Sequence, residues 1–128
     1  MTAPCPHKKK HGATRGGMKI DRDILGSAMS LSSLLSYQRR SIVSRTLVES
    51  KGCTVTLFAF DAGQGLSEHS APFNAMVHVL DGTVEISIGG VPHRLKAGDL
   101  VVMPADIPHA VRALTRFRML LTMARTGV

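Results

Sequence analysis

The sequence predicts a single all-β domain, built as a barrel or a double-sheet jelly roll. Short apolar runs recur at regular spacing between residues 41 and 124, and turn-forming residues separate them. The pairs Asp81-Gly82 and Gly89-Gly90 are typical of two-residue hairpins, because both central positions of such turns favour positive φ. A length of 128 residues suits one domain with one buried core.

Two segments precede this predicted barrel. The predicted divisions are a disordered basic tail over residues 1–17, an N-terminal extension over residues 18–40 and the barrel over residues 41–124. The tail combines Pro, Gly, Lys and His without a periodic apolar face. In the extension, Leu31, Leu34 and Leu35 stand at helical spacing, which predicts a short helix or turn between Ser30 and Tyr37.

The strands are predicted from apolar residues that recur with a period of two. In the run 74–80, Ala75, Val77 and Val79 share one face, whereas His78 belongs to the other face. In the run 53–60, both faces carry residues that can be at least half buried. The predicted strands cover residues 42–48, 53–60, 74–80, 83–88, 91–95, 100–103, 108–113 and 116–123.

The positive charge of the chain is concentrated near its start. A net charge of +7 would suit a nucleic-acid-binding protein. However, Lys8, Lys9, Lys10 and Arg15 supply more than half of this excess, and residues 1–17 contain no acidic residue. With one tyrosine and four phenylalanines, the predicted barrel has few aromatic side chains for stacking on bases. We therefore do not expect a nucleic-acid partner.

Two cysteines, Cys5 and Cys53, are too few for a disulfide framework and are typical of a reducing compartment. No apolar run approaches the roughly 20 residues that cross a bilayer. The basic stretch near the start is not followed by the apolar segment of a secretory signal. These observations predict a cytoplasmic protein without a membrane partner, in which Cys53 is a small core residue.

Between Gly63 and Gly82 the chain resembles the first motif of the cupin superfamily. That motif reads Gly, five residues, His-x-His, three or four residues, Glu, six residues and Gly. Gly63, His69 and Gly82 match it in this chain. Alanines, Ala71 and Ala75, stand at the positions of the second histidine and of the glutamate.

The second cupin motif reads Gly, five residues, Pro-x-Gly, two residues, His, three residues and Asn. Gly98, Pro104 and His109 match it, whereas Asp106 and Ala113 replace the second glycine and the asparagine. The resemblance covers about residues 41–124 and implies a small single-domain cupin, an RmlC-like jelly-roll barrel (double-stranded β-helix). The residues at the positions of the first motif are similar to those of a group of small bacterial cupins. This resemblance implies no particular chemistry.

The resemblance also implies a position for a divalent metal such as iron, manganese, nickel or zinc. Of the four ligand positions of the family, this chain keeps His69 and His109. Two imidazoles alone hold a metal weakly unless a third ligand completes the site. His78 and Glu68 belong to the opposite faces of their extended segments, so we do not expect them to supply it. We therefore predict a degenerate metal site, with no cofactor or with a weakly held divalent metal.

The two alanines leave room beside the histidines, which favours a small-molecule-binding protein. No catalytic residue is predicted. Two alternatives stay open: a metal-dependent enzyme of oxygenase or isomerase type that uses His69 and His109, and a homodimerising structural module with Met76, His78 and Leu80 on its outer face. Apolar strands carry Met76, Met103, Met119 and Met123, which we expect to pack in the core. A methionine-lined pocket is compatible with this packing and would suit a small hydrophobic or flat ligand. The predicted pocket residues are His69, Ala71, Ala75, Val77, Met103, His109 and Val111.

Overall fold

The computed structural model describes residues 13–15 and 17–125, and this part of the chain is almost entirely β-structure. It contains eleven strands and one turn of 3-10 helix. None of its helical structure has the length and apolar character that a membrane span requires. The elements are β1 (Ala13–Arg15), β2 (Met18–Ile20), η2 (Leu31–Ser33), β3 (Ile42–Glu49), β4 (Cys53–Phe60), β5 (Gly65–His69), β6 (Asn74–Asp81), β7 (Thr83–Ile88), β8 (Val91–Lys96), β9 (Leu100–Met103), β10 (His109–Ala113) and β11 (Phe117–Ala124).

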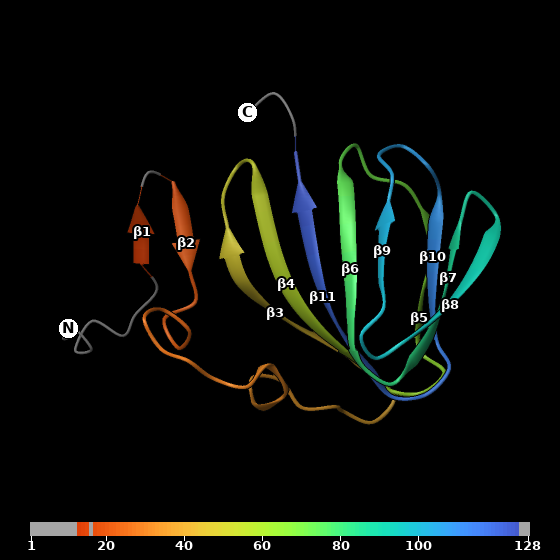
Figure 1. The fold of residues 1–128 in the computed structure, drawn as a ribbon, viewed down its shortest axis with the longest axis horizontal. Coiled ribbons are helices and arrows are strands. Elements are labelled where there is room, and N and C mark those ends of the chain that lie inside the picture. Colours follow the sequence, from red (N-terminus) through yellow and green to blue (C-terminus); the bar gives the residue numbers. More distant parts are fainter. Residues whose placement is uncertain (1–12, 16, 126–128) are drawn as a thin grey trace.

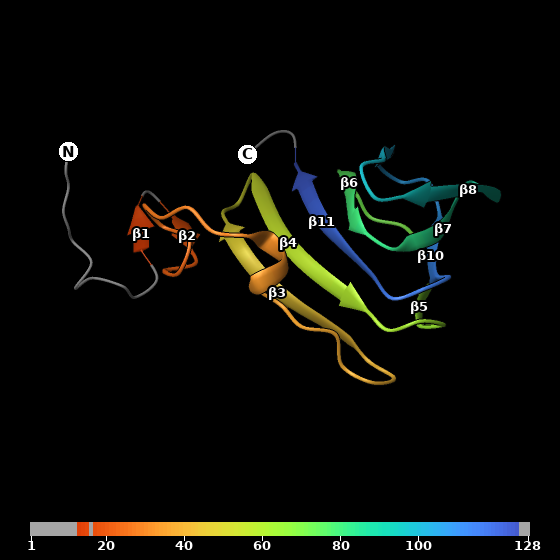
Figure 2. The same cartoon turned by 60° about the horizontal axis from the view of Figure 1, so that its bottom comes forward.

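The strands form two antiparallel sheets. The larger sheet has the order β1-β2-β3-β4-β11-β6-β9, and the smaller sheet has the order β5-β10-β7-β8. The last strand, β11, lies between β4 and β6, so the closing segment of the chain completes the middle of the larger sheet. Figures 1 and 2 show the smaller sheet facing the β6–β9 part of the larger sheet. This arrangement confirms the predicted all-β jelly roll.

The eight predicted strands correspond to β3, β4 and β6 to β11, with ends that agree to within one residue. Along β6, Ala75, Val77 and Val79 are buried and His78 is exposed, as the period of two predicted. At the turn between β6 and β7, Gly82 has a φ of 83°. A Cβ atom there would collide with the backbone carbonyl of Arg116, so the chain requires glycine at this position. The hairpin predicted at Asp81-Gly82 is nevertheless wrong, because β6 and β7 belong to different sheets and the chain bends there from one sheet to the other. The hairpin predicted at Gly89-Gly90 is confirmed, since it joins the paired strands β7 and β8.

Three strands were not predicted. β5 has the sequence GLSEH and is exposed at four of its five positions, so it lacks an apolar alternation. Its extended form comes from pairing with β10. β1 pairs with β2 around Gly17, which has a φ of 84°. Residues 1–12 and 16 lie outside the described residues, so the predicted disordered tail stays a prediction there, whereas Ala13–Arg15 is a strand.

The main core lies between the two sheets. Phe60 and Phe117 stack there with ring centroids 4.6 Å apart, and both are fully buried. A second cluster lies on the outer face of the larger sheet, where Leu34 packs with Leu47 and Leu57. Leu34 belongs to the N-terminal extension, which lies over β3 and β4 in Figure 2. The extension therefore covers the part of this face that β3, β4 and β11 form.

The predicted helix between Ser30 and Tyr37 is reduced to the single turn η2. The hydroxyl of Ser33 donates to the carbonyl of Ser30 (2.7 Å), a local bond that competes with helix formation. Helices of so few residues are also marginal without strong packing. The outer face predicted for homodimerisation is also corrected at one residue. Leu80 packs against the second cluster, so it does not belong to an exposed outer face.

Candidate functional site

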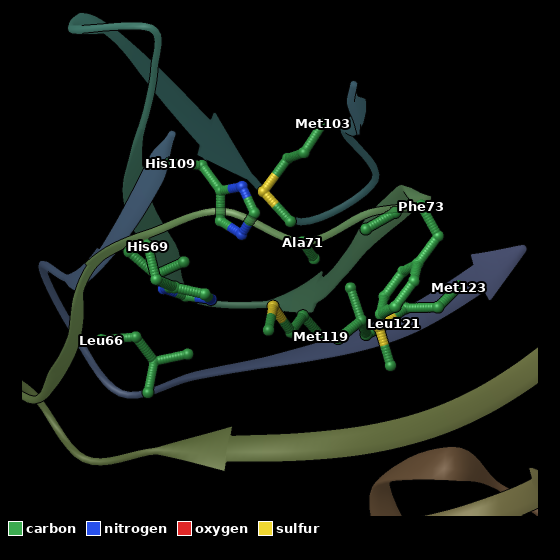
Figure 3. Close-up of a pocket in the computed structure, with 11 residues that line it drawn as sticks. Leu66, His69, Ala71, Phe73, Met103, His109, Met119, Leu121 and Met123 are labelled. Atoms are coloured by element: carbon green, nitrogen blue, oxygen red, sulfur yellow. The ribbon is translucent and has the colours of Figure 1, made fainter. Parts of the chain in front are cut away.

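The loops of the barrel gather at two opposite ends. At one end, upper in Figure 1, lie the connections β5–β6 and β9–β10. A cavity of about 260 Å³ lies there, and Figure 3 shows the side chains around it. Both sheets contribute to it. Its described lining consists of Leu66, His69, Ala71, Phe73, Ala75, Met103, His109, Val111, Met119, Leu121 and Met123.

Strand alternation explains most of this lining. On β11, Met119, Leu121 and Met123 occupy every second position and therefore share the face that looks into the barrel. Ala75 of β6 is in register with both Met123 of β11 and Met103 of β9. Three neighbouring strands of the larger sheet thus form one continuous apolar wall.

The smaller sheet supplies two histidines. His69 ends β5 and His109 begins β10, and the two residues are partners in the strand register. The register shifts between His109 and Val111, an irregularity of the kind that redirects side chains beside functional sites. The two imidazole ring centroids lie 4.5 Å apart with a 68° angle between the ring planes. Both rings point into the cavity (Figure 3).

Each histidine is oriented by a backbone carbonyl two residues before it. Nδ1 of His69 donates to the carbonyl oxygen of Ser67 (2.8 Å), and Nδ1 of His109 donates to that of Ile107 (3.3 Å). Because a carbonyl oxygen only accepts, the hydrogen of each neutral ring is on Nδ1. Nε2 of each ring then keeps a free lone pair. The site therefore offers two acceptors within an apolar cavity.

His109 is the more buried of the two, with 6% of its surface exposed, whereas His69 is exposed. Burial lowers the pKa of His109, and the neighbouring His69 lowers it as well, while the hydrogen bond to Ile107 acts in the opposite direction. His109 is therefore neutral at pH 7. A neutral ring is the form that accepts a hydrogen bond or binds a metal.

Two hydrogen bonds join the loops on either side of the cavity. The backbone N–H of Asp106 donates to the carbonyl of Ala71 (2.8 Å), and that of Ala105 donates to Oδ1 of Asn74 (2.9 Å). Asp106 stands where the second cupin motif has glycine, and its φ of 66° is the left-handed conformation that aspartate tolerates better than most residues. The substitution therefore preserves the loop that leads to His109.

The donor set does not match the divalent-metal site that the cupin resemblance implies. The described lining contains no carboxylate and no thiol. Among residues 13–15 and 17–125, no three His, Cys, Asp or Glu side chains gather closely enough to hold an ion. Ala71 and Ala75 line the cavity without offering a donor, and Glu68 and His78 are exposed. The described lining would therefore supply an iron, manganese, nickel or zinc ion with two imidazole ligands and no third donor of the family's type.

Six of the seven predicted pocket residues line this cavity: His69, Ala71, Ala75, Met103, His109 and Val111. The seventh, Val77, is fully buried in the core further along β6. The prediction missed Leu66, Phe73, Met119, Leu121 and Met123. Alternation along β11 indicates that its three residues share one face, but it does not reveal which end of the strand borders a cavity.

The prediction for Cys53 is also corrected. Cys53 begins β4 and is only half-buried, so it is not the core residue we expected.

Comparison with known proteins gives consistent matches over the barrel. A family model described as "Cupin domain" matches residues 56–123. A conserved protein of unknown function from Streptococcus pyogenes is 36% identical, with a TM-score of 0.77 over 80% of this chain and 90% of that one. A cupin superfamily protein from Desulfitobacterium hafniense is 25% identical, with a TM-score of 0.74 over 77% of this chain and 91% of that one.

One curated relative matches over a shorter stretch. Protein SchB from Streptomyces halstedii is 35% identical over 51 residues. The match spans 39% of this chain and 37% of that relative.

Proposed function

The chain belongs to the cupin family, and from this premise we propose that it binds a small, uncharged and largely apolar molecule in the cavity beside His69 and His109. The observation that supports this proposal most directly is the lining of the cavity. Nine of its eleven described residues are apolar, and the two polar ones are histidines with free Nε2 acceptors. Such a lining, apolar with a few oriented polar groups, is typical of small-molecule sites.

The size of the cavity limits the ligand. An apolar cavity of about 150 Å³ admits benzene. At about 260 Å³, this cavity suits a molecule of one or two rings, or an aliphatic molecule of similar volume. It is too small for most drug-sized ligands, whose pockets start at roughly 300 Å³.

The lining also limits the charge and the polar groups of the ligand. No Lys, Arg, Asp or Glu is among the described lining residues, so a charged organic ligand would be buried there without a counter-charge. The two Nε2 atoms accept hydrogen bonds, so a hydroxyl or N–H group on the ligand would be satisfied. A phenol-like molecule combines these properties.

The test is a titration of the full chain with 2-naphthol and with naphthalene, followed by ligand fluorescence. We expect 2-naphthol to bind about fivefold more tightly, because its hydroxyl donates to an imidazole Nε2, a bond worth about 1 kcal/mol. Ala71→Leu fills the cavity and should weaken binding of both molecules at least tenfold. Ala97→Leu is the matched control in an exposed turn and should bind like the native chain. Binding unaffected by Ala71→Leu, or no binding to the native chain, contradicts the proposal.

We favour binding over metal-dependent catalysis for this pocket. An oxygenase or isomerase of the cupin type would need a third imidazole or carboxylate beside His69 and His109. Ala71 and Ala75 stand at the positions that would supply one. A cytoplasmic location remains a prediction from the cysteine content.

A second proposal, homodimerisation, is supported by an apolar strip on the outer face of β6 and β9. Met76 and Val102 are register partners there, and Leu100 and Val102 are 58% and 50% exposed. The N-terminal extension covers the neighbouring part of this face but not the strip. A second copy fits, since an apolar strip paired across a two-fold axis is self-complementary. We expect a dimer in light scattering for the native chain and a monomer for Val102→Glu; a native monomer at micromolar concentration contradicts this.

A further inference from the structure

Methionines are concentrated around the two histidines. The chain has seven methionines, and three of them, Met103, Met119 and Met123, line the one cavity that holds His69 and His109. Figure 3 shows the thioether sulfurs of Met103 and Met119 inside this cavity together with both imidazole rings. These two methionines are 4% and 1% exposed, so their sulfurs are shielded from water.

The imidazoles are arranged as metal ligands usually are. A metal-binding histidine almost always donates its second ring nitrogen to a carbonyl or carboxylate, which fixes the tautomer and the ring orientation. Both His69 and His109 do so, through Nδ1 and the carbonyls of Ser67 and Ile107. The ring centroids lie 4.5 Å apart and both rings point into the same cavity (Figure 3), so the two imidazoles can contribute to one site.

The available donors select the type of ion. All of them are neutral, and the described lining contains no anion to balance charge. A divalent ion in this apolar cavity would be poorly compensated, whereas a monovalent ion carries a much smaller desolvation penalty. Thioether sulfur is a soft ligand that selects copper(I), and imidazole also binds copper. Magnesium, calcium and manganese prefer oxygen donors, which this lining lacks.

We propose that the pocket binds one copper(I) ion through Nε2 of His69 and His109 and the thioethers of Met103 and Met119. This soft site differs in ligands and in metal from the divalent site that the cupin motifs imply. Copper(I) binding at this site requires no organic ligand, so this proposal is independent of the function proposed above. Methionine side chains rotate easily, so both sulfurs can approach an ion without movement of the backbone.

The experiment is an anaerobic titration of the chain with the copper(I)–bicinchoninate complex, whose colour is lost when the protein takes the metal. The full-length protein carries Cys5→Ala, His7→Ala, His11→Ala and Cys53→Ala, which removes other thiols and the N-terminal histidines as competing ligands. We expect one copper(I) per chain. Met103→Leu and Met119→Leu conserve core volume and should each weaken binding about tenfold or more. His109→Phe should weaken it further, whereas Met29→Leu, an exposed control, should change nothing.

Two outcomes would overturn the proposal. One is the absence of copper(I) transfer from the chelator, and the other is transfer that both methionine variants retain unchanged. X-ray absorption at the copper edge, on the same protein with its methionines intact, provides a check that does not depend on a folded variant. It should detect sulfur neighbours, and a signal with nitrogen and oxygen neighbours alone contradicts the site. Naphthol binding without copper uptake would leave the proposed function standing and reject this inference alone.

Discussion

The two ends of the barrel are built from opposite kinds of interaction. At the end away from the pocket, which we call the closed end, polar groups satisfy one another. Tyr37 donates to Asp81 (2.8 Å), Arg118 bonds the other oxygen of Asp81 (2.6 Å), and the Arg118 guanidinium lies 4.2 Å from the centre of the Tyr37 ring. Close by, Asp61 accepts from the side chain of Arg116 (2.9 Å) and from the backbone N–H of Arg40 (2.7 Å).

The pocket end has few such bonds. The two polar side chains of the described cavity lining, His69 and His109, each use one ring nitrogen and leave the other without a protein partner. Its apolar lining encloses space, whereas Phe60 and Phe117 fill the core nearer the closed end. The difference teaches that satisfied and unsatisfied polar groups are separated along the barrel axis. One end fastens the N-terminal extension to the barrel, and the other end leaves two ring nitrogens beside a cavity.

The largest expected effect is on the closed side of the core. Phe117→Ala removes a fully buried ring that stacks on Phe60, and it should lower the free energy of unfolding by about 3–5 kcal/mol. Leu121→Ala, on the same strand but beside the cavity, should cost only about 1–2 kcal/mol, because that side chain is half-buried. Urea denaturation of both variants measures the difference. Equal losses would mean that the pocket end is packed as tightly as the core.

A smaller effect is expected from the polar network of the closed end. Asp81→Ala removes the acceptor of Tyr37 and the partner of Arg118, whose side chain is only 13% exposed. We expect a loss of about 2 kcal/mol, since a partly buried guanidinium is left unpaired. Glu85→Ala breaks the more exposed ion pair with Arg112 and should cost less than about 1 kcal/mol. Thermal unfolding compares the two, and similar losses would show that the network contributes no more than a surface pair.

The smallest effects are those of pH, and they differ between the ends. The pKa of His109 is below its ordinary value of 6.5, so the unfolded chain binds this proton more readily. The pocket end therefore loses stability as the pH falls below about 6.5. At the closed end, hydrogen bonds from Arg40 and Arg116 lower the pKa of Asp61 from 3.8 to about 2, and burial and the bond to Asp81 raise that of Tyr37 from 10.0 to about 12.

The closed end should therefore respond in two other pH ranges. Asp61 stabilises the fold above pH 3.8, and this contribution is lost as the pH falls towards 2. The Tyr37 contribution is present below pH 10 and is lost as the pH rises towards 12. Unfolding free energies from pH 5 to 8 should show a slope that His109→Phe reduces and Tyr37→Phe does not change. An unchanged slope in His109→Phe would assign the acid response to other groups.

Much of the fold was predictable because its signals are local. Alternation along β6 identified the buried face, and Gly89-Gly90 marked the hairpin between β7 and β8. Asp81-Gly82 marked a turn, but its local signal did not reveal that β6 and β7 belong to different sheets. β5 was not predictable in the same way, because its exposed polar residues form a strand only through pairing with β10. The N-terminal extension lost its predicted helix for a related reason: Leu34 packs on the larger sheet instead of lining a helix face.

By itself, the sequence determined the strand pattern, the positions of the turns and the presence of histidines at two motif positions, since each depends on residues that are close in the chain. Only the tertiary structure decided that Met119 and Met123 of β11 line the same cavity as these histidines, and that the closed end fastens the extension to the barrel. The physical reason is the insertion of β11 between β4 and β6. Pairing between distant strands follows from how whole sheets pack, and a local period does not encode it.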